Sequence, residues 1–260
     1  MGQREFSTHV ENRIEILTIN REEALNGLNL QLVRDMKDEF IRVKADNSIK
    51  VLIITGQGSK SFCAGADINE LLGRSIDQEK HDMLLGQETF SILENMGKPT
   101  IAAINGYALG GGLEMALACT FRIASSNSQL GLTETNLGII PGYGGTQRLS
   151  RLIGPKKALR IILLGKRLSV EEAMQIGLID DVVEADNLMD KCMELAQNLS
   201  SRSATASALA MESVLRGFEM NIKDGLLLEA NLAILALHTE GAEEGIKAFL
   251  EKRKPDFKDK

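Results

Sequence analysis

The stretch ALGGGLEMALAC, residues 108–119, joins three consecutive glycines to an apolar segment that carries a single carboxylate. The residues after the glycines, from Leu113 to Ala118, are otherwise apolar and predict a buried helix. Glu114 lies in the first turn of that helix. The positive end of the helix dipole favours a glutamate there, so Glu114 taken alone is explained by the dipole, by a capping contact or by chemistry.

The segments on both sides of this stretch alternate between strand and helix patterns. Most of the expected strands are short apolar runs, and the first alternates apolar and polar residues like a half-buried strand. The expected strands are IEILTI (14–19), VLIIT (51–55), TIAAI (100–104), FRIAS (121–125), QLGL (129–132) and IDDVV (179–183).

Helical patterns connect these strands. Apolar residues recur at helical spacing through the charged segment 32–43, which predicts an amphipathic helix. The polar segment around 74–82 has a weak pattern and is expected to be a mobile surface loop, followed by a helix to about Met96. Further helices are expected from Gln147 and from the capping box Ser169-Val-Glu-Glu172.

The C-terminal part of the chain is expected to be almost entirely helical. The helices are expected at 186–201, 204–219, 224–239 and 241–252. Strands alternating with helices, followed by helices alone, indicate an α/β core with a helical C-terminal appendage. We therefore divide the chain into a core over residues 1–200 and a helical region over residues 201–260.

Composition limits the classes of function. The net charge is −6, and the chain has no Trp and two Tyr, which argues against a nucleic-acid surface. No apolar run resembles a signal peptide or is long enough to span a membrane. Cys63, Cys119 and Cys192 lack metal-ligand spacing, and the three histidines are scattered. These features predict a cytoplasmic protein with reduced thiols, no metal site and no contact with nucleic acid or membrane.

Three glycine clusters could be mistaken for phosphate-binding loops. GQGSKS (56–61) lacks the first glycine of a P-loop, and GYALGGG (106–112) does not match the dinucleotide-binding pattern. GYGGTQ (142–147) is compatible with a tight turn. Each cluster by itself is explained by backbone geometry, because glycine permits positive φ and close approach between chain segments.

Taken together, these clusters carry a family resemblance. FCAGAD (62–67), NGYALGGGLE (105–114) and GLTETNLGIIPGYGGTQRL (131–149) occur in the order and spacing of the enoyl-CoA hydratase/isomerase family, the crotonase family. NREEALNGLN (20–29) and the tail AFLEKRKPDFKD (248–259) are similar to the same family. The resemblance implies a spiral of ββα turns, with C-terminal helices that pack on the core and on the neighbouring subunit in a trimer or a dimer of trimers.

The resemblance also implies an oxyanion hole, formed by the backbone N–H groups of Ala66 and Gly111. When water adds to an enoyl thioester, negative charge accumulates on the thioester oxygen. Unpaired N–H groups at a helix N-terminus are suited to stabilise that charge. Glycine at position 111 leaves room for the thioester.

Two glutamates complete the implied catalytic site. By resemblance, Glu134 gives a proton to Cα, and Glu114 helps to position and deprotonate the water that attacks Cβ. Two carboxylates that share a water repel each other, so one can remain protonated near neutral pH. Glu134 alone could be an acidic residue on a surface loop. The presence of both glutamates favours an enoyl-CoA hydratase of fatty-acid β-oxidation or related acyl-CoA catabolism. By resemblance, the reaction needs no metal and no redox cofactor.

The coenzyme A part of the substrate is expected, by resemblance, at Ala64, Asp67 and Ile68. Asp67 could instead cap the helix that follows it. Family members often carry basic residues where this chain has Glu22, Glu23 and Asn69. Lys252 is a further candidate for the phosphates, reaching from a neighbouring subunit. Candidates for the acyl pocket are Leu71, Leu72, Ile140 and Tyr143.

Other functions on the same scaffold stay open at this point. They are an enoyl-CoA isomerase, a branched-chain hydratase of the methylglutaconyl-CoA type, an RNA-binding homologue and an inactive assembly subunit. The glutamate pair argues against an isomerase and an inactive subunit, and the acidic composition argues against RNA.

Overall fold

The core of the protein is a six-stranded sheet. The structure is a computed structural model that describes residues 4–70 and 72–258. The strand order is β1-β2-β3-β5-β7-β10, in which β1 is antiparallel to β2 and the other pairs are parallel. The strands are β1 (Phe6–Glu11), β2 (Ile14–Ile19), β3 (Val51–Gly56), β5 (Thr100–Ile104), β7 (Phe121–Ser125) and β10 (Asp181–Val183).

A second sheet lies at one end of the first and is built from shorter strands. Its order is β4-β6-β8-β9, with the first three strands parallel to one another. The strands are β4 (Ser61–Cys63), β6 (Tyr107–Leu109), β8 (Gln129–Gly131) and β9 (Leu168–Ser169). Each long strand β3, β5 and β7 is followed by one short strand and then by a helix, so the chain advances in ββα turns.

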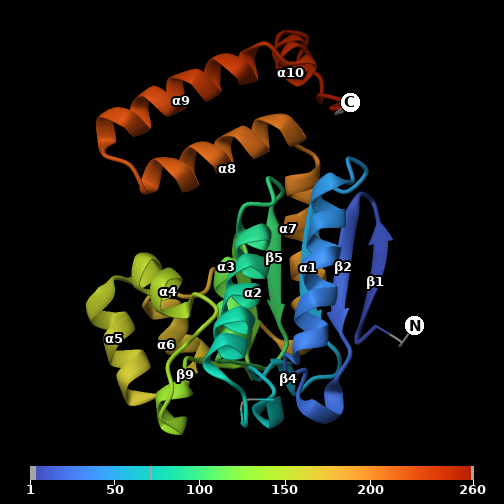
Figure 1. Cartoon of the computed structure of the whole chain (residues 1–260). Helices are drawn as coiled ribbons and strands as arrows, with labels where there is room; N and C mark the ends of the chain where they lie inside the picture. Colours follow the sequence, from blue (N-terminus) through green and yellow to red (C-terminus); the bar gives the residue numbers. More distant parts are fainter. Residues whose placement is uncertain (1–3, 71, 259–260) are drawn as a thin grey trace.

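Helices cover both faces of the large sheet (Figure 1). Residues in β3 are buried on both faces because they alternate: Leu52 and Ile54 pack in the larger core, whereas Val51 and Ile53 pack in a smaller core with α7. The helices are α1 (Leu30–Ala45), α2 (Ile76–Glu94), α3 (Gly111–Ala118), α4 (Gly145–Ile153), α5 (Pro155–Leu164), α6 (Val170–Gln175), α7 (Leu188–Ser200), α8 (Ala204–Phe218), α9 (Ile222–Leu237) and α10 (Glu240–Leu250).

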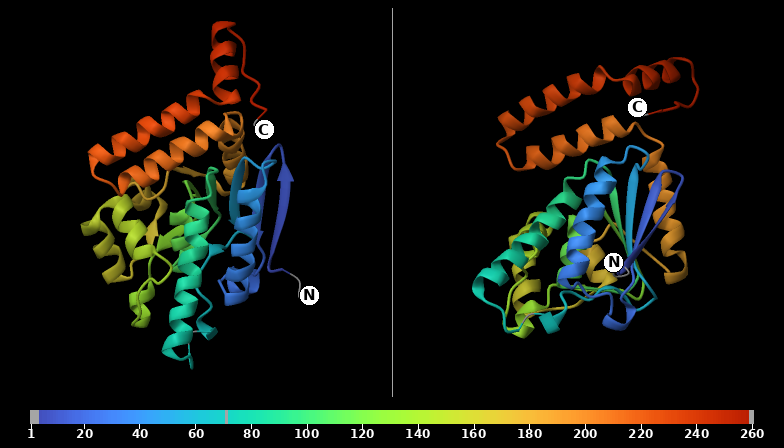
Figure 2. Two further views of the ribbon diagram at one scale, coloured as in Figure 1. Left: turned by 45° about the horizontal axis from the view of Figure 1, so that its top comes forward. Right: turned by 45° about the vertical axis from the view of Figure 1, so that its right-hand side comes forward.

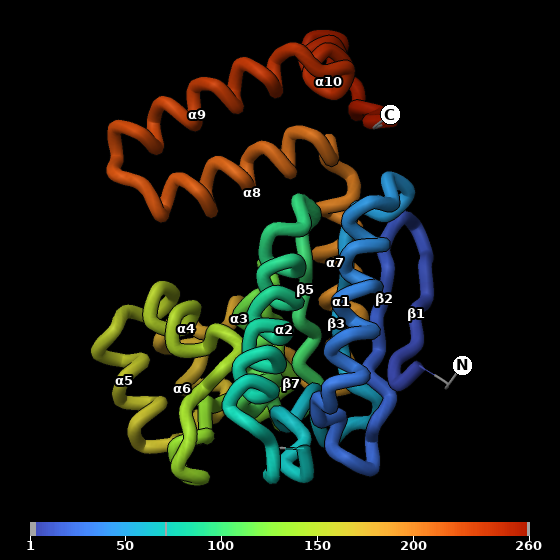
Figure 3. Tube along the Cα trace, viewed as in Figure 1, coloured from blue at the N-terminus to red at the C-terminus, as the bar shows by residue number. Residues whose placement is uncertain are grey.

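The last three helices extend from the core as an arm. α8 and α9 lie side by side across one end of the large sheet, opposite the end that holds β4 (Figures 1, 2 and 3). Leu232 and Ala248 are the buried residues of α8, α9 and α10, although these helices are rich in apolar side chains. The arm begins after Ser200, where α7 ends.

Three sequence predictions need correction. The segment 74–82 is not a loop, because α2 begins at Ile76 behind a capping box formed by Ser75 and Gln78. The apolar pattern there is weak because the first two turns of α2 are largely exposed. Strand β1 was missed because five of its six residues are exposed. Helix α4 begins at Gly145 rather than at Gln147.

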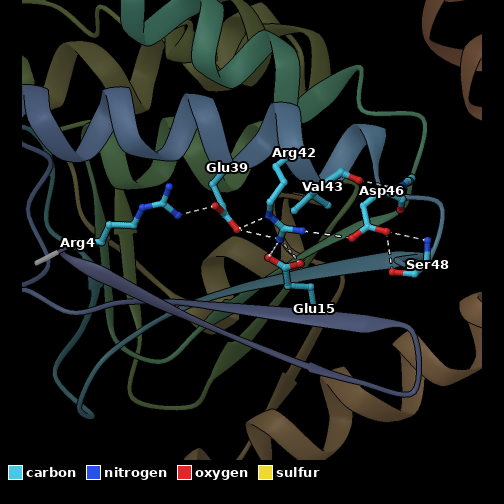
Figure 4. A network of polar contacts seen from close by, with 8 residues as sticks. Arg4, Glu15, Glu39, Arg42, Val43, Asp46 and Ser48 are labelled. Carbon is cyan, nitrogen blue, oxygen red and sulfur yellow. Dashed lines mark hydrogen bonds and ion pairs between the residues drawn. The ribbon is translucent and has the colours of Figure 1, made fainter. Parts of the chain in front are cut away.

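An ion-pair network fastens α1 to β2 (Figure 4). Glu15, on β2, is fully buried, and its carboxylate contacts the Arg42 guanidinium of α1. The same guanidinium contacts Glu39 at 2.8 Å and Asp46 at 3.3 Å. Arg4 pairs with Glu39 at 2.9 Å from the other side. Each buried carboxylate in this network therefore has a guanidinium partner.

Candidate active site

Three loops meet at one edge of the small sheet. Because β4, β6 and β8 are parallel neighbours, their carboxyl ends lie at the same edge. β4 leads into residues 64–67, β6 leads into the glycines before α3, and β8 leads into a short 3-10 helix, Glu134–Leu137. The sheet topology thus brings the three sequence motifs together in space.

The glycines before α3 allow these loops to approach closely. A Cβ added at Gly112 would lie 2.0 Å from the carbonyl oxygen of Cys63, and one at Gly111 would lie 3.5 Å from the amide nitrogen of Ala66. Gly110 has φ of 50° and ψ of −125°, a conformation that a residue with a side chain rarely adopts. A Cβ at Gly110 would also lie 3.1 Å from Oε1 of Glu134.

The amides of Ala66 and Gly111 are free to donate. Leu28 forms a parallel bridge with Ala66, in which the N–H of Leu28 donates to Gly65 and the N–H of Asp67 donates to Leu28. This pattern leaves the N–H of Ala66 facing away from Leu28. Gly111 is the first residue of α3, so its N–H has no intrahelical acceptor. Neither amide donates to a residue within the described part of the chain.

Glu114 does not face solvent, because its side chain is only 2% exposed. Its Oε1 accepts hydrogen bonds from the backbone N–H groups of Tyr143, at 2.8 Å, and Gly145, at 2.7 Å. A Cβ at Gly145 would lie 2.9 Å from Cγ of Glu114, so glycine is needed there. Burial, reinforced by the nearby charge of Glu134, raises the pKa of Glu114 to about 7 even though the two N–H groups act in the opposite direction.

Glu134 lies across the same cavity at the start of the 3-10 helix. Its Oε2 is buried and has no hydrogen-bond partner among the residues that the structure describes. Burial also raises the pKa of Glu134. Glu114 is thus buried and Glu134 half-buried, and Glu114 has the charged form of its carboxylate stabilised by two backbone N–H groups, whereas Oε2 of Glu134 has no donor among the described residues.

The cavity that contains both glutamates has a volume of about 900 Å³. It is lined by seven of the residues predicted for the site: Ala64, Ala66, Asp67, Ile68, Gly111, Glu114 and Glu134. Tyr143 and Ile140 line it as well. Leu72 does not line the cavity and is 85% exposed, and Leu71 lies outside the described residues. Lys252 follows α10 at the opposite end of the molecule from β4 and does not line this cavity (Figure 1).

Asp67 has a partner that the sequence did not suggest. Its Oδ2 accepts a hydrogen bond from the Arg21 guanidinium at 3.1 Å, and its Oδ1 accepts from the backbone N–H of Asn69 at 3.2 Å. Arg21 lowers the pKa of Asp67 more than any other group does. Arg21 also pairs with Glu5 at 3.0 Å. The Asp67 carboxylate therefore holds the 64–67 loop against the N-terminal part of the chain.

Two basic residues at the cavity were also missed. Lys60 and Arg167 line it, and the Arg167 guanidinium lies 5.7 Å from the centre of the Tyr107 ring. Lys60 belongs to the GQGSKS cluster, whose spacing does not match a P-loop. Arg167 precedes the short strand β9, whose pairing with β8 brings it to the site. No single-sequence pattern connects these two positions.

The described part of the chain shows no candidate metal centre. Residues 4–70 and 72–258 hold no group of three or more His, Cys, Asp and Glu side chains that could bind a metal ion. Cys63, Cys119 and Cys192 are buried and free. Within these residues, no helix has both the length and the apolar character needed to cross a membrane.

Comparisons with known proteins agree with this geometry. A family model described as "Enoyl-CoA hydratase/isomerase" matches residues 9–260. A crotonyl-CoA hydratase from Syntrophomonas wolfei is 41% identical and covers 95% of both chains. A short-chain-enoyl-CoA hydratase from Clostridium acetobutylicum is 40% identical and covers 94% of both chains.

Solved structures agree at the level of the fold. The crystal structure of an enoyl-CoA hydratase from Bacillus anthracis superposes with a TM-score of 0.95 at 40% identity, over 98% of this chain and 100% of the other. A structure from Geobacillus kaustophilus reaches 0.95 at 32% identity, over 99% of this chain and 98% of the other. The predicted crotonase spiral with a helical C-terminal region is confirmed, and the chain belongs to the enoyl-CoA hydratase/isomerase family.

Proposed function

We propose that this protein is an enoyl-CoA hydratase, which adds water reversibly across the C2–C3 double bond of a trans-2-enoyl-CoA to give a 3-hydroxyacyl-CoA. The observation that carries the proposal is the presence of two carboxylates, the buried Glu114 and the half-buried Glu134, beside two unpaired backbone N–H groups in one cavity. The names of the hydratase relatives, at about 40% identity over almost the whole chain, support it.

The two amides supply the electrostatic part of the reaction. The thioester oxygen accepts hydrogen bonds from the N–H groups of Ala66 and Gly111. As water adds to Cβ, electron density moves onto this oxygen, and the two donors stabilise the enolate that forms. Because they belong to a fixed loop and a helix N-terminus, they need no reorganisation during the reaction. One such donor contributes about 10²–10³ in rate.

The two glutamates divide the proton transfers. Glu114 is the better base in the ionised state, because two N–H groups stabilise its carboxylate. Glu134 is the better proton carrier, because its Oε2 has no donor among the described residues to stabilise a charge. The water oxygen bonds to Cβ and its proton goes to Glu114, while the proton of Glu134 goes to Cα. No metal or redox cofactor takes part in these steps.

The coenzyme A moiety enters past the 64–67 loop. Lys60 and Arg167 line the cavity and are the residues of this chain that we assign to the phosphates. Ala64 and Ile68 contact the adenine through the loop backbone, while Asp67 keeps the loop in place through Arg21. Lys252 can bind the coenzyme A phosphates only from a neighbouring subunit.

The helical arm provides the surface for self-association as a trimer or a dimer of trimers. Its large exposed apolar side chains would be costly to leave in water. They include Val214, Phe218, Ile222, Leu226, Leu227, Ile234, Leu235, Leu237, Ile246, Phe249 and Leu250. A cytoplasmic location fits the three buried, free cysteines.

The test is the hydration of crotonyl-CoA by the purified protein and by Glu134→Gln. The substitution removes the proton that Cα needs, so kcat should fall by about 10²–10⁴ with the fold intact. Glu11→Gln, on the exposed face of β1, is the matched control and should keep wild-type turnover. Near wild-type activity of Glu134→Gln would refute the assignment. A panel of branched enoyl-CoAs and of 3-enoyl-CoAs distinguishes a branched-chain hydratase and an isomerase.

A further inference from the structure

Helix α2 contains a glycine, Gly86, in its interior, where glycine weakens a helix relative to alanine. The position is buried beneath the ring of Tyr143. A Cβ at Gly86 would lie 2.3 Å from Cδ1 and 2.4 Å from Cε1 of that ring. A side chain at position 86 and the ring of Tyr143 therefore exclude each other.

The ring of Tyr143 is also fixed by its other neighbours. Phe90, one turn further along α2, meets it edge to face at a centroid distance of 5.7 Å and an angle of 81°. The Tyr143 side chain is only 7% exposed. Its backbone N–H is bound to Glu114, so the position of the ring is coupled to the catalytic carboxylate. The ring is thus a rigid part of the site.

Met83 of α2 and Tyr143, whose ring packs on α2 at Gly86, both line the cavity and form its α2 wall. Met83 packs tightly on the loop before Tyr143, because a Cβ at Gly142 would lie 2.3 Å from its Sδ. The basic residues Lys60 and Arg167 line the same cavity, and each directly precedes a strand of the small sheet, β4 and β9 respectively. Tyr143 lies next to Glu114, which acts at Cβ in the proposed reaction, so the α2 side of the cavity is a part of it that an acyl chain beyond Cβ can reach.

We propose that Tyr143 limits the length of the acyl chain that this enzyme accepts, and that Gly86 is the recess that its ring occupies. The inference rests on the proposed hydratase function and names the substrate class, short enoyl-CoAs. Removing the ring opens the recess over Gly86 to the cavity. Each methylene of a longer chain that enters it should gain about 0.8 kcal/mol, which is about fourfold in kcat/KM.

The test compares crotonyl-CoA with trans-2-decenoyl-CoA. In Tyr143→Ala, the ratio of kcat/KM for the long substrate to that for the short one should rise by about tenfold or more over wild type. Tyr143→Phe, which keeps the ring, is the matched control and should keep the wild-type ratio. Adding Gly86→Leu to Tyr143→Ala refills the recess and should return the ratio toward wild type. Tyr143→Leu should give a smaller shift in the same direction, and replaces Tyr143→Ala if that variant does not fold.

A second readout separates this inference from the proposed function. The affinities for butyryl-CoA and decanoyl-CoA, measured by calorimetry, require no turnover, because a saturated thioester has no double bond to hydrate. Failure of the wild type to hydrate any enoyl-CoA would refute the proposed hydratase function. The role of Tyr143 in acyl-chain length would then still be tested by the two affinities. An unchanged ratio of the two affinities in Tyr143→Ala, or the same change in Tyr143→Phe, would overturn the role of the ring.

Discussion

Glu15, Glu39 and Glu114 are buried and Glu134 is half-buried, and these glutamates form two pairs with different surroundings. Glu15 and Glu39 share the guanidinium of Arg42, and Glu39 also pairs with Arg4. Glu114 and Glu134 form no ion pair with any residue that the structure describes; the former has two backbone donors and the latter leaves Oε2 unpaired.

The difference separates a structural contact from a reactive site. A buried carboxylate with a bound guanidinium holds two elements together, as Glu15 does for β2 and α1. A buried carboxylate without a cation in ion-pair contact can have its pKa raised into the neutral range, as burial does for Glu114. Burial alone does not distinguish the proposed catalytic pair, because burial also raises the pKa of Glu15; the lack of an arginine in ion-pair contact does.

The largest contrast is expected between Glu114→Gln and Glu39→Gln. Glu114→Gln removes the base that activates water, so kcat should fall by about 10²–10⁴. Glu39→Gln should leave kcat near the wild-type value, because its carboxylate pairs with Arg4 and Arg42 and does not line the cavity. Turnover of crotonyl-CoA by both variants measures the contrast, and equal losses would show that the two pairs do not differ in role.

The pH dependence of the same variant sharpens the contrast. Because Glu114 acts in its ionised form, kcat of the wild type should rise with pH through the pKa of about 7. Because the pKa of Glu114 is higher in the folded state than its unfolded value of 4.5, ionisation of Glu114 destabilises the folded protein. This loss of stability develops as pH rises from 4.5 to 7. Glu114→Gln should therefore be more stable than wild type at pH 8, by about 3 kcal/mol, and equal to it below pH 4. Denaturant unfolding at the two pH values gives this difference.

A smaller effect, on stability alone, is expected from Arg42→Met. The substitution leaves Glu15 buried without its cation, at a cost of about 1–3 kcal/mol after allowance for the partial exposure of Arg42. Because burial already raises the pKa of Glu15, protonation should recover part of the loss at pH 5. Urea unfolding at pH 7 and pH 5 measures this, with kcat unchanged. A loss of activity without loss of stability would contradict the structural role.

The smallest effects are expected at the cavity mouth. Lys60→Gln and Arg167→Gln each remove one cation that meets a phosphate, so KM for crotonyl-CoA should rise about two- to fivefold with little change in kcat. Higher salt should reduce the difference from wild type, because screening weakens exposed charge contacts. KM values that are independent of both substitutions and of salt would exclude these two residues from the phosphate site.

The sequence predicted the fold where local patterns are strong. The buried strands at 51–55 and 100–104 and the capping box at Ser169 were recognised from apolar runs and cap chemistry. The start of α2 and strand β1 were missed, because exposed elements carry little apolar periodicity.

For the site, the motifs placed Glu114, Glu134 and the 64–67 loop in one cavity, because motif order reflects the turns of the spiral. The Arg21–Asp67 contact, the cations Lys60 and Arg167 and the fit of Tyr143 over Gly86 join residues 46 or more positions apart. Such pairs depend on tertiary packing, and one sequence contains no local signal for them.

The central claim is that burial and the charge of Glu134 raise the pKa of Glu114 in a cavity where neither glutamate has an ion-pair partner among the described residues, and the protonation of Glu114 tests it most directly. Infrared difference spectroscopy can follow the protonated carboxyl band that is present in wild type and absent in Glu114→Gln. The account predicts that this band titrates near pH 7, and at lower pH in Glu134→Gln, where the neighbouring charge is gone. Titration near pH 4.5, or a midpoint that Glu134→Gln does not change, would contradict it.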